Sequence, residues 1–186
     1  MVWAPARLTV LAGPSGVGKG AVAALLAERH PKVYLSVSAT TRPPRPGEVE
    51  GENYFFVTRP VFEAAARAGE LLEWAEYNGN LYGTPRPAVE DALGAGRPAL
   101  LEIDLAGARQ VRQTMPGALQ VFLMPPTWAE LERRLIGRGT EGPAERLRRL
   151  ATAEREVQAR GEFDFVLTND DLGETVGRLA VIMGLN

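Results

Sequence analysis

The chain of 186 residues contains no cysteine. Disulfides and thiolate zinc sites are therefore excluded, and a reducing cytoplasm is the expected location. Lys19 and Lys32 are the only lysines, so nearly all of the positive charge is carried by arginine, which suits bidentate contacts to phosphate. The net charge of −2 argues against broad adhesion to nucleic acid or to an anionic membrane surface.

Long apolar runs are also missing. No segment approaches the ~18–20 apolar residues that a membrane-spanning helix needs. The apolar run at residues 8–12 is too short for the hydrophobic region of a signal peptide. We therefore expect no membrane or targeting segment. Hydrophobic residues make up 45% of the chain and charged residues 24%, which is typical of a globular protein with one well-buried core.

The most informative segment that is present is a glycine-rich turn between a predicted strand at residues 7–12 and a predicted helix at 18–29. Glycines can turn successive backbone N–H groups inward around an anion, and the positive end of the helix dipole points at the same place. This arrangement matches a P-loop and predicts the binding of a polyphosphate. The residues assigned to it are Gly13, Pro14, Ser15, Gly16, Val17, Gly18, Lys19 and Gly20.

The position after Lys19 departs from the usual P-loop pattern. A serine or threonine there commonly ligates Mg²⁺, but this chain has Gly20 followed by Ala21. Phosphate binding by the backbone survives the change. The sequence therefore assures no direct protein ligand for the Mg²⁺ that accompanies ATP.

Strand-like and helix-like segments alternate along most of the chain, which predicts an α/β fold with a parallel sheet covered by helices on both faces. The predicted strands are 7–12, 33–37, 99–103, 120–124 and 165–168. The predicted helices are 18–29, 87–93, 106–114, 127–138, 144–160 and 172–183. Capping-box patterns, Thr127 with Glu130 and Asp171 with Glu174, mark two of the helix starts.

The interval 38–82 breaks this alternation with aromatic, extended pieces, a short helix at 60–68 and an Asn78-Gly79 turn typical of a β-hairpin. We interpret residues 1–186 as a single domain. Its core comprises 1–37 and 83–186, a small β-rich insertion spans about 38–82, and a glycine-rich, mobile lid spans about 137–148.

Three prolines surround two arginines in the insertion. Pro43, Pro44 and Pro46 favour a polyproline conformation whose repeat places Arg42 and Arg45 on one edge, as a fork for a dianionic phosphate. Taken alone, a solvated proline-rich loop explains the pattern equally well. Beside a P-loop, a second phosphate site is the better interpretation.

Five separated motifs, in order and at matching spacing, resemble the guanylate kinase family. They are the P-loop, Ser36-Val-Ser-Ala-Thr-Thr-Arg-Pro-Pro-Arg-Pro-Gly-Glu48, Glu73-Trp-Ala-Glu76 with Asn78-Gly-Asn-Leu-Tyr-Gly-Thr84, Glu102-Ile-Asp104 and Arg138-Gly-Thr140. The resemblance covers essentially the whole chain. It implies a P-loop kinase with a GMP-binding insertion that transfers the γ-phosphoryl group of ATP to GMP, with Mg²⁺ accompanying ATP.

The resemblance also implies roles for residues at matching positions. GMP or dGMP would be bound by Ser38, Arg42, Arg45, Tyr54, Glu73, Tyr82, Thr84 and Asp104. Catalysis would involve Lys19, Arg134, Arg138 and Arg149. Asn169 would contact adenine, and Glu102 would help to order Mg²⁺ through water. No protein partner, nucleic acid or membrane is expected to be needed.

The chemistry of guanine agrees with these roles. Guanine offers N1–H and N2–H₂ as adjacent donors, which one carboxylate can accept together, whereas adenine has no proton on N1. Two other classes stay open at this point. One is a guanylate-kinase-like module that only binds protein partners, although the P-loop and the set of arginines speak against it. The other is a P-loop kinase for another acceptor, such as AMP or a deoxynucleotide, or a regulatory GTPase, although the chain lacks the Asn-Lys-x-Asp guanine motif of GTPases.

Overall fold

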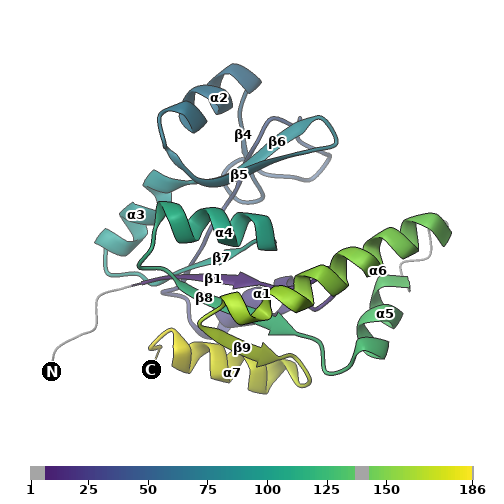
Figure 1. Ribbon diagram of the computed structural model, residues 1–186. Helices are drawn as coiled ribbons and strands as arrows, with labels where there is room; N and C mark the ends of the chain where they lie inside the picture. Colours follow the sequence, from purple (N-terminus) through teal and green to yellow (C-terminus); the bar gives the residue numbers. More distant parts are fainter. Residues whose placement is uncertain (1–6, 137–142, 186) are drawn as a thin grey trace, which may run out of the picture.

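A computed structural model describes residues 7–136 and 143–185. Its centre is a five-stranded sheet in the order β2-β7-β1-β8-β9, with every neighbouring pair parallel. The predicted α/β class and parallel sheet are confirmed (Figure 1). The strands are β1 (Leu8–Ala12), β2 (Tyr34–Leu35), β7 (Ala99–Glu102), β8 (Leu119–Met124) and β9 (Phe165–Thr168).

Helices cover both faces of this sheet, and each face has its own hydrophobic core. One core is formed with α1 (Lys19–Arg29), α5 (Trp128–Ile136), α6 (Pro143–Gln158) and α7 (Leu172–Ile182). The other is formed with α3 (Arg86–Gly94) and α4 (Leu105–Thr114). In Figure 1, α3 and α4 lie on the side of the sheet that faces the insertion, and α7 lies on the opposite side.

Most predicted boundaries in the described residues lie within a residue of those in the structure, and two larger differences have a physical reason. The strand expected at 33–37 pairs only at Tyr34 and Leu35, because the chain turns away toward the insertion once the N–H of Ser36 has bonded to Leu100. The helix expected to reach residue 160 ends at Gln158 and continues as a 3₁₀ turn, η1 (Ala159–Glu162). Such tightening is common at the carboxyl ends of helices.

The insertion contains a second sheet in the order β4-β3-β6-β5, with α2 (Arg59–Arg67) packed against it. Its strands are β3 (Ala39–Thr40), β4 (Phe55–Phe56), β5 (Leu71–Tyr77) and β6 (Asn80–Pro85). The predicted hairpin is confirmed, since Asn78 and Gly79 both have positive φ, 49° and 76°, between antiparallel β5 and β6. Two consecutive positive φ angles are the requirement of a type I′ turn.

Both predicted helix caps are present. Thr127 Oγ1 accepts the N–H of Glu130 at 3.1 Å, and Asp171 Oδ1 accepts the N–H of Glu174 at 2.8 Å. The side chain of Glu130 does not complete the box, because it binds Arg133 and Arg134 instead. These pairs lower the pKa of Glu130 to about 2.

Candidate active site

The glycine-rich loop follows β1 and leads directly into α1, as the sequence predicted. Gly13, Gly16 and Gly18 all have positive φ. A Cβ on Gly13 would lie 2.4 Å from the carbonyl oxygen of Leu123, and a Cβ on Gly18 would lie 2.7 Å from Asn169 Nδ2. Glycine is therefore required at both positions by space as well as by backbone conformation.

Lys19 folds back over this loop. Its Nζ donates to the carbonyl oxygen of Gly13 at 2.7 Å and lies 3.4 Å from that of Pro14. Burial lowers the pKa of Lys19, and the nearby carboxylate of Glu102 opposes that shift. The ammonium group of Lys19 is therefore held beside the loop by neutral carbonyl oxygens. A phosphate oxygen can take the place of these carbonyl oxygens as its hydrogen-bond acceptor.

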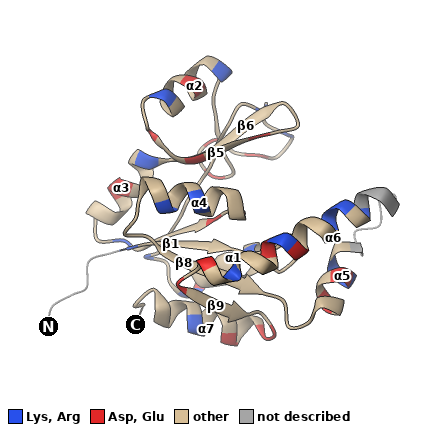
Figure 2. Ribbon diagram, viewed as in Figure 1, with Lys and Arg blue, Asp and Glu red and all other residues tan. Residues whose placement is uncertain are grey.

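Two of the three predicted catalytic arginines lie against the loop. Arg134 Nη1 is 3.4 Å from the carbonyl oxygen of Val17, and its Nε donates to Glu130 at 2.6 Å. Arg149 Nη2 is 3.3 Å from Ser15 Oγ. The third, Arg138, lies outside the described residues, as does the 137–142 part of the predicted lid. Basic and acidic residues stand close together along α6 in Figure 2.

Two further side chains support the loop. Asn169 is buried, and its Nδ2 donates to the carbonyl oxygen of Val17 at 2.9 Å. This hydrogen bond joins Asn169 to the P-loop. The contact of Asn169 with adenine stays a prediction. Glu156, on α6, lies near the backbone of Ser15 and near Lys19. Burial raises the pKa of Glu156. Sequence reasoning missed Glu156, although it lies two helix turns after Arg149 on the same face of α6.

The predicted phosphate clamp is partly assembled. Arg42 stacks over the ring of Tyr54 at 5.4 Å, and the rings of Tyr54 and Tyr82 are 6.0 Å apart in an edge-on arrangement. Arg45 is exposed. Both arginine positions contact Glu48: Arg42 Nη2 donates to its two carboxylate oxygens at 2.8 and 2.9 Å, and the N–H of Arg45 donates at 2.7 Å.

Glu48 is the last residue of the motif at 36–48, and the sequence predicted no role for it. Its carboxylate fixes the guanidinium of Arg42, and hydrogen bonds from Arg42 hold the pKa of Glu48 below its usual range. Within the predicted clamp, the guanidinium of Arg42 is already held in place, whereas the positive charge of Arg45 is exposed to solvent. Charge-assisted bidentate bonds of this kind are geometrically specific.

Of the four predicted guanine readers, Glu73, Thr84 and Asp104 lie together at the junction of the insertion and the core. Glu73 is only 9% exposed and accepts the hydroxyl of Thr84 at 2.7 Å. Burial raises the pKa of Glu73, and the charge of Asp104 adds to that rise. Asp104 follows β7 and accepts the N–H of Gly107 at 2.7 Å as the N-cap of α4. Ser38 is half-buried beside β3.

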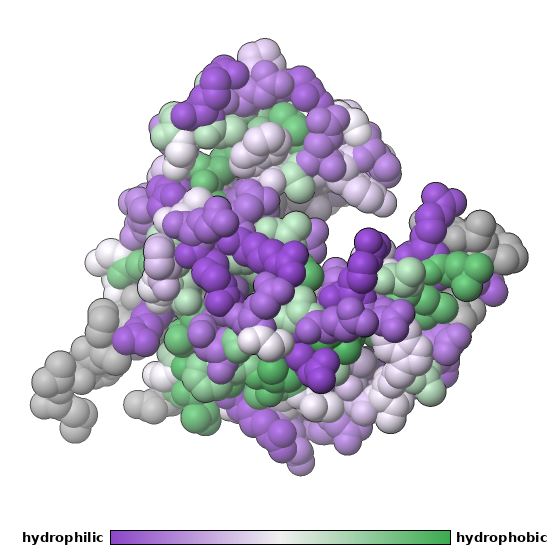
Figure 3. Space-filling view, viewed as in Figure 1, coloured by the Kyte–Doolittle hydropathy of each residue, from purple (hydrophilic) through white to green (hydrophobic). Residues whose placement is uncertain are grey.

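The two halves of the site share one edge of the parallel sheet. The P-loop follows β1, and Glu102 and Asp104 stand at the end of the neighbouring strand, β7. Ligands bind at the carboxyl ends of parallel strands in such sheets. The molecular surface is hollowed between the insertion and the projecting α6 (Figure 3).

No ready-made metal centre occurs in the described parts of the chain, where no group of three or more His, Asp or Glu side chains is placed to hold an ion. Glu102 lies near Lys19, and burial raises its pKa. A Cβ on Gly20 would lie 3.5 Å from Glu102 Oε2. The carboxylate therefore faces the place where a P-loop serine would carry its hydroxyl.

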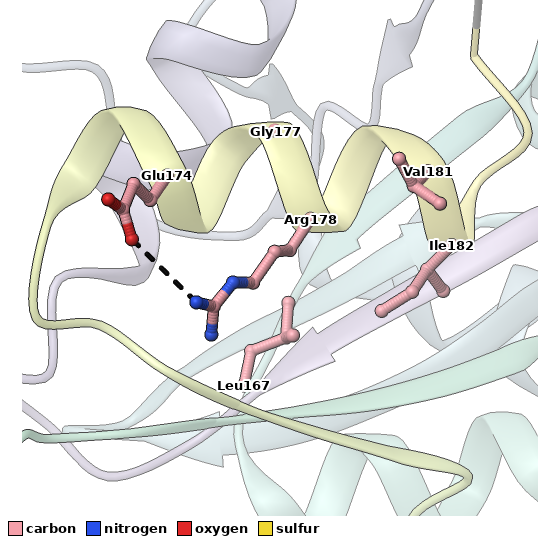
Figure 4. Close-up of a pocket in the computed structure, with 6 residues that line it drawn as sticks. All are labelled: Leu167, Glu174, Gly177, Arg178, Val181 and Ile182. Atoms are coloured by element: carbon pink, nitrogen blue, oxygen red, sulfur yellow. Dashed lines mark ion pairs between the residues drawn. The ribbon is translucent and has the colours of Figure 1, made fainter.

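An apolar hollow elsewhere on the surface lies between α7 and β9 (Figure 4). An ion pair between Glu174 and Arg178, at 3.7 Å and one turn apart on α7, lies at its edge. None of the predicted site residues lines it. Its lining is Leu167, Glu174, Gly177, Arg178, Val181 and Ile182.

Among residues 7–136 and 143–185, no helix combines the length and the apolar character that crossing a bilayer requires.

Comparison with known proteins agrees with the geometry of the site. A family model described as guanylate kinase matches residues 5–185. A guanylate kinase of Synechococcus sp. (strain CC9902) is 58% identical over 179 residues, 96% of each chain. One from Thermobifida fusca (strain YX) is 56% identical over 179 residues, 96% of this chain and 91% of that protein.

Solved structures give the same result. The crystal structure of guanylate kinase from Anaplasma phagocytophilum superposes with a TM-score of 0.75 at 36% identity, covering 99% of this chain and 87% of that one. Shikimate kinase from Bacteroides thetaiotaomicron, at 14% identity and a TM-score of 0.50 over 96% of this chain and 99% of that one, shares the fold alone. With a glycine-rich loop between β1 and α1 as the sequence predicted, and with these matches over nearly its whole length, the chain belongs to the guanylate kinase family.

Proposed function

We propose that this protein transfers the γ-phosphoryl group of ATP to GMP, giving ADP and GDP. The observation that carries the proposal is the placement of an anion-binding loop after β1 and of Asp104 after the neighbouring strand β7, with the buried carboxylate of Glu73 on β5 close to Asp104. A donor polyphosphate and an acceptor phosphate bound at such sites would meet across one sheet edge.

On the donor side, the backbone N–H groups of residues 13–20 and the ammonium of Lys19 bind the phosphates of ATP. Arg134 and Arg149 lie close enough to the loop to neutralise charge on the transferring group, with Arg138 as the third predicted arginine. Catalysis then consists of alignment and charge neutralisation, because the phosphate oxygen of GMP is an adequate nucleophile once it lies in line with ATP.

On the acceptor side, Arg42, Arg45, Tyr54 and Tyr82 hold the phosphate of GMP. Glu73 accepts N1–H and N2–H₂ of guanine, supported by Thr84, Ser38 and Asp104. A site built around such hydrogen bonds can reject a base that lacks the matching donors by ~10⁴-fold or more, because its buried acceptor is left unpaired.

The residues present fit a Mg²⁺ ion that is held mainly by the phosphates of ATP. The carboxylate of Glu102 faces the start of α1 at Gly20, and we assign it to water molecules of the ion's hydration shell. Bound Mg²⁺ supplies charge neutralisation to the phosphates. Mg²⁺ commonly keeps several of its waters in such sites.

We further propose that the enzyme works in the cytoplasm without an obligatory protein partner. The cysteine-free composition and the two nucleotide substrates support this location. Fractionation of cells that produce the tagged chain, with the activity followed through gel filtration, tests both statements.

A turnover assay against GMP, dGMP, AMP, CMP, UMP and IMP, with ATP and Mg²⁺, tests the main proposal. We expect ADP release with GMP at least about 100-fold faster than with AMP. ADP release that depends equally on AMP would identify a kinase for another acceptor. No ADP release with any acceptor would favour the non-catalytic binding module, and GTP hydrolysis without an acceptor would favour the GTPase.

A further inference from the structure

One face of α4 holds the strand that carries Glu73. Gln110 and Thr114, one helix turn apart, both bond to the backbone of β5. Gln110 Oε1 accepts the N–H of Trp74 at 3.1 Å, and its Nε2 donates to the carbonyl oxygen of Trp74 at 3.0 Å. Thr114 Oγ1 donates to the carbonyl oxygen of Leu72 at 2.6 Å. The backbone of β5 is therefore hydrogen-bonded to α4 on both sides of Glu73.

The strand needs this support because of its place in the sheet. β5 is an edge strand, and its pairing with β6 shifts register between Leu71 and Trp74, so the segment with Glu73 lies at an irregularity. A side-chain amide presents the same donor and acceptor as a peptide group. Gln110 thus makes the two backbone hydrogen bonds that a neighbouring strand would make, at the point where regular pairing is interrupted.

The same helix leaves room for the carboxylate itself. Gly107 lies one turn before Gln110, and a Cβ there would be 3.1 Å from Glu73 Oε2 and 3.4 Å from Asp104 Oδ1. The first contact is tighter than ordinary side-chain packing. The absent side chain lets Glu73 and Asp104 approach each other at the N-terminus of α4.

We propose that the face of α4 formed by Gly107, Gln110 and Thr114 positions Glu73, and that Gln110 thereby sets the selectivity for guanine. This inference rests on the proposed function. Gln110 is a positioning residue, since it acts through the backbone of β5. One carboxylate must face two adjacent donors of the base at once, and a displacement of about 1 Å in such a site can cost as much as ~100-fold.

The test compares Gln110→Met with Gln113→Met. Methionine is close to glutamine in length but cannot make both backbone bonds, and Gln113 is an exposed glutamine on the same helix. We measure kcat and KM for GMP, for ATP and for IMP, whose base lacks the 2-amino group. For Gln110→Met we expect KM for GMP to rise about tenfold, with kcat and KM for ATP unchanged and a smaller preference for GMP over IMP. Gln113→Met should match the wild type.

A double variant separates positioning from general support. If Gln110 acts through Glu73, Gln110→Met should change KM for GMP little once Glu73→Gln is present, because the reader has already been removed. Multiplicative effects of the two changes, or equal losses for GMP and IMP, would overturn the proposal.

Gly107→Ala gives a second approach if Gln110→Met folds poorly. Its matched control is Gly177→Ala, a helical glycine with open space at the Cβ position. We expect Gly107→Ala, and not its control, to lose preference for GMP over IMP; unchanged preference would overturn the proposal. A wild type that does not phosphorylate GMP would instead refute the proposed function, which keeps the two failures distinct.

Discussion

Glu73 is subject to two opposing demands. Its burial favours the protonated form and raises its pKa, whereas accepting both donors of guanine requires the ionised form. The hydrogen bond from Thr84 offsets part of the shift, because it stabilises the carboxylate. In the proposed role, bound guanine supplies the remaining hydrogen-bond donors to this carboxylate.

Replacing this carboxylate should therefore reduce the selectivity for GMP more than it weakens the binding of ATP. In Glu73→Gln one acceptor oxygen becomes an NH₂ group that faces the donors of guanine. We expect kcat/KM for GMP to fall roughly 100-fold while KM for ATP stays within about twofold. Steady-state kinetics with each substrate varied in turn measure both values. Unchanged GMP kinetics would refute the base-reading role.

The raised pKa of Glu73 also predicts a pH dependence. As the pH falls toward that pKa the carboxylate gains a proton and loses acceptor capacity, so KM for GMP should rise on the acid side. The phosphate of GMP protonates near pH 6 as well, but equally for wild type and Glu73→Gln. The difference between the two pH profiles isolates Glu73. Parallel profiles would show that Glu73 does not titrate in this range.

Gly20 offers a test of how Mg²⁺ is held. Gly20→Ser would add a hydroxyl beside Glu102, whereas Gly20→Ala adds the same Cβ without the hydroxyl. We expect the serine variant to reach half-maximal rate at roughly tenfold lower Mg²⁺ than the alanine variant. Titration of Mg²⁺ at a fixed ATP concentration measures the Mg²⁺ concentration that gives the half-maximal rate. Identical titrations would mean that the loop position has no influence on the ion.

Whole elements were predictable where their signals are local. The strand and helix around the P-loop, the Asn78-Gly79 hairpin and the cap at Asp171 each depend on residues a few positions apart. Glu156 and Gln110 were not predictable, because their partners, Ser15 and Trp74, lie far along the chain. Only the packing of α6 over the P-loop and of α4 against β5 brings these groups together.

The cap of α7 gives a stability prediction for a single element. Asp171→Ala removes the acceptor for the N–H of Glu174 and should lower the free energy of unfolding by about 1 kcal/mol. Asp170→Ala, at the exposed neighbouring position, is the control and should change it by less than about 0.5 kcal/mol. Urea unfolding of the two variants decides, and equal losses would show that the cap bond contributes nothing.

At the scale of the whole molecule, the two proposed phosphate sites lie in different parts. The donor loop belongs to the parallel sheet, and the clamp belongs to the insertion. The surface between the insertion and α6 is open in Figure 3. Phosphoryl transfer from ATP without hydrolysis requires water to be excluded, so we predict that the insertion approaches the P-loop when both nucleotides bind.

Small-angle X-ray scattering tests this closure. With GMP and a non-hydrolysable ATP analogue together, the radius of gyration should fall below that of the free protein. GMP alone should give part of the decrease, because the clamp lies in the insertion. A radius that stays constant under all conditions would contradict closure.

The most direct measurement of the central claim uses a compound that joins adenosine and guanosine through one polyphosphate chain. If the P-loop and the arginine clamp face each other across the ends of β1 and β7, this compound fills both sites at once. We predict inhibition that is competitive against ATP and competitive against GMP, and weakened by Arg42→Ala. Competition with only one of the two substrates would show that the donor and acceptor sites do not face each other.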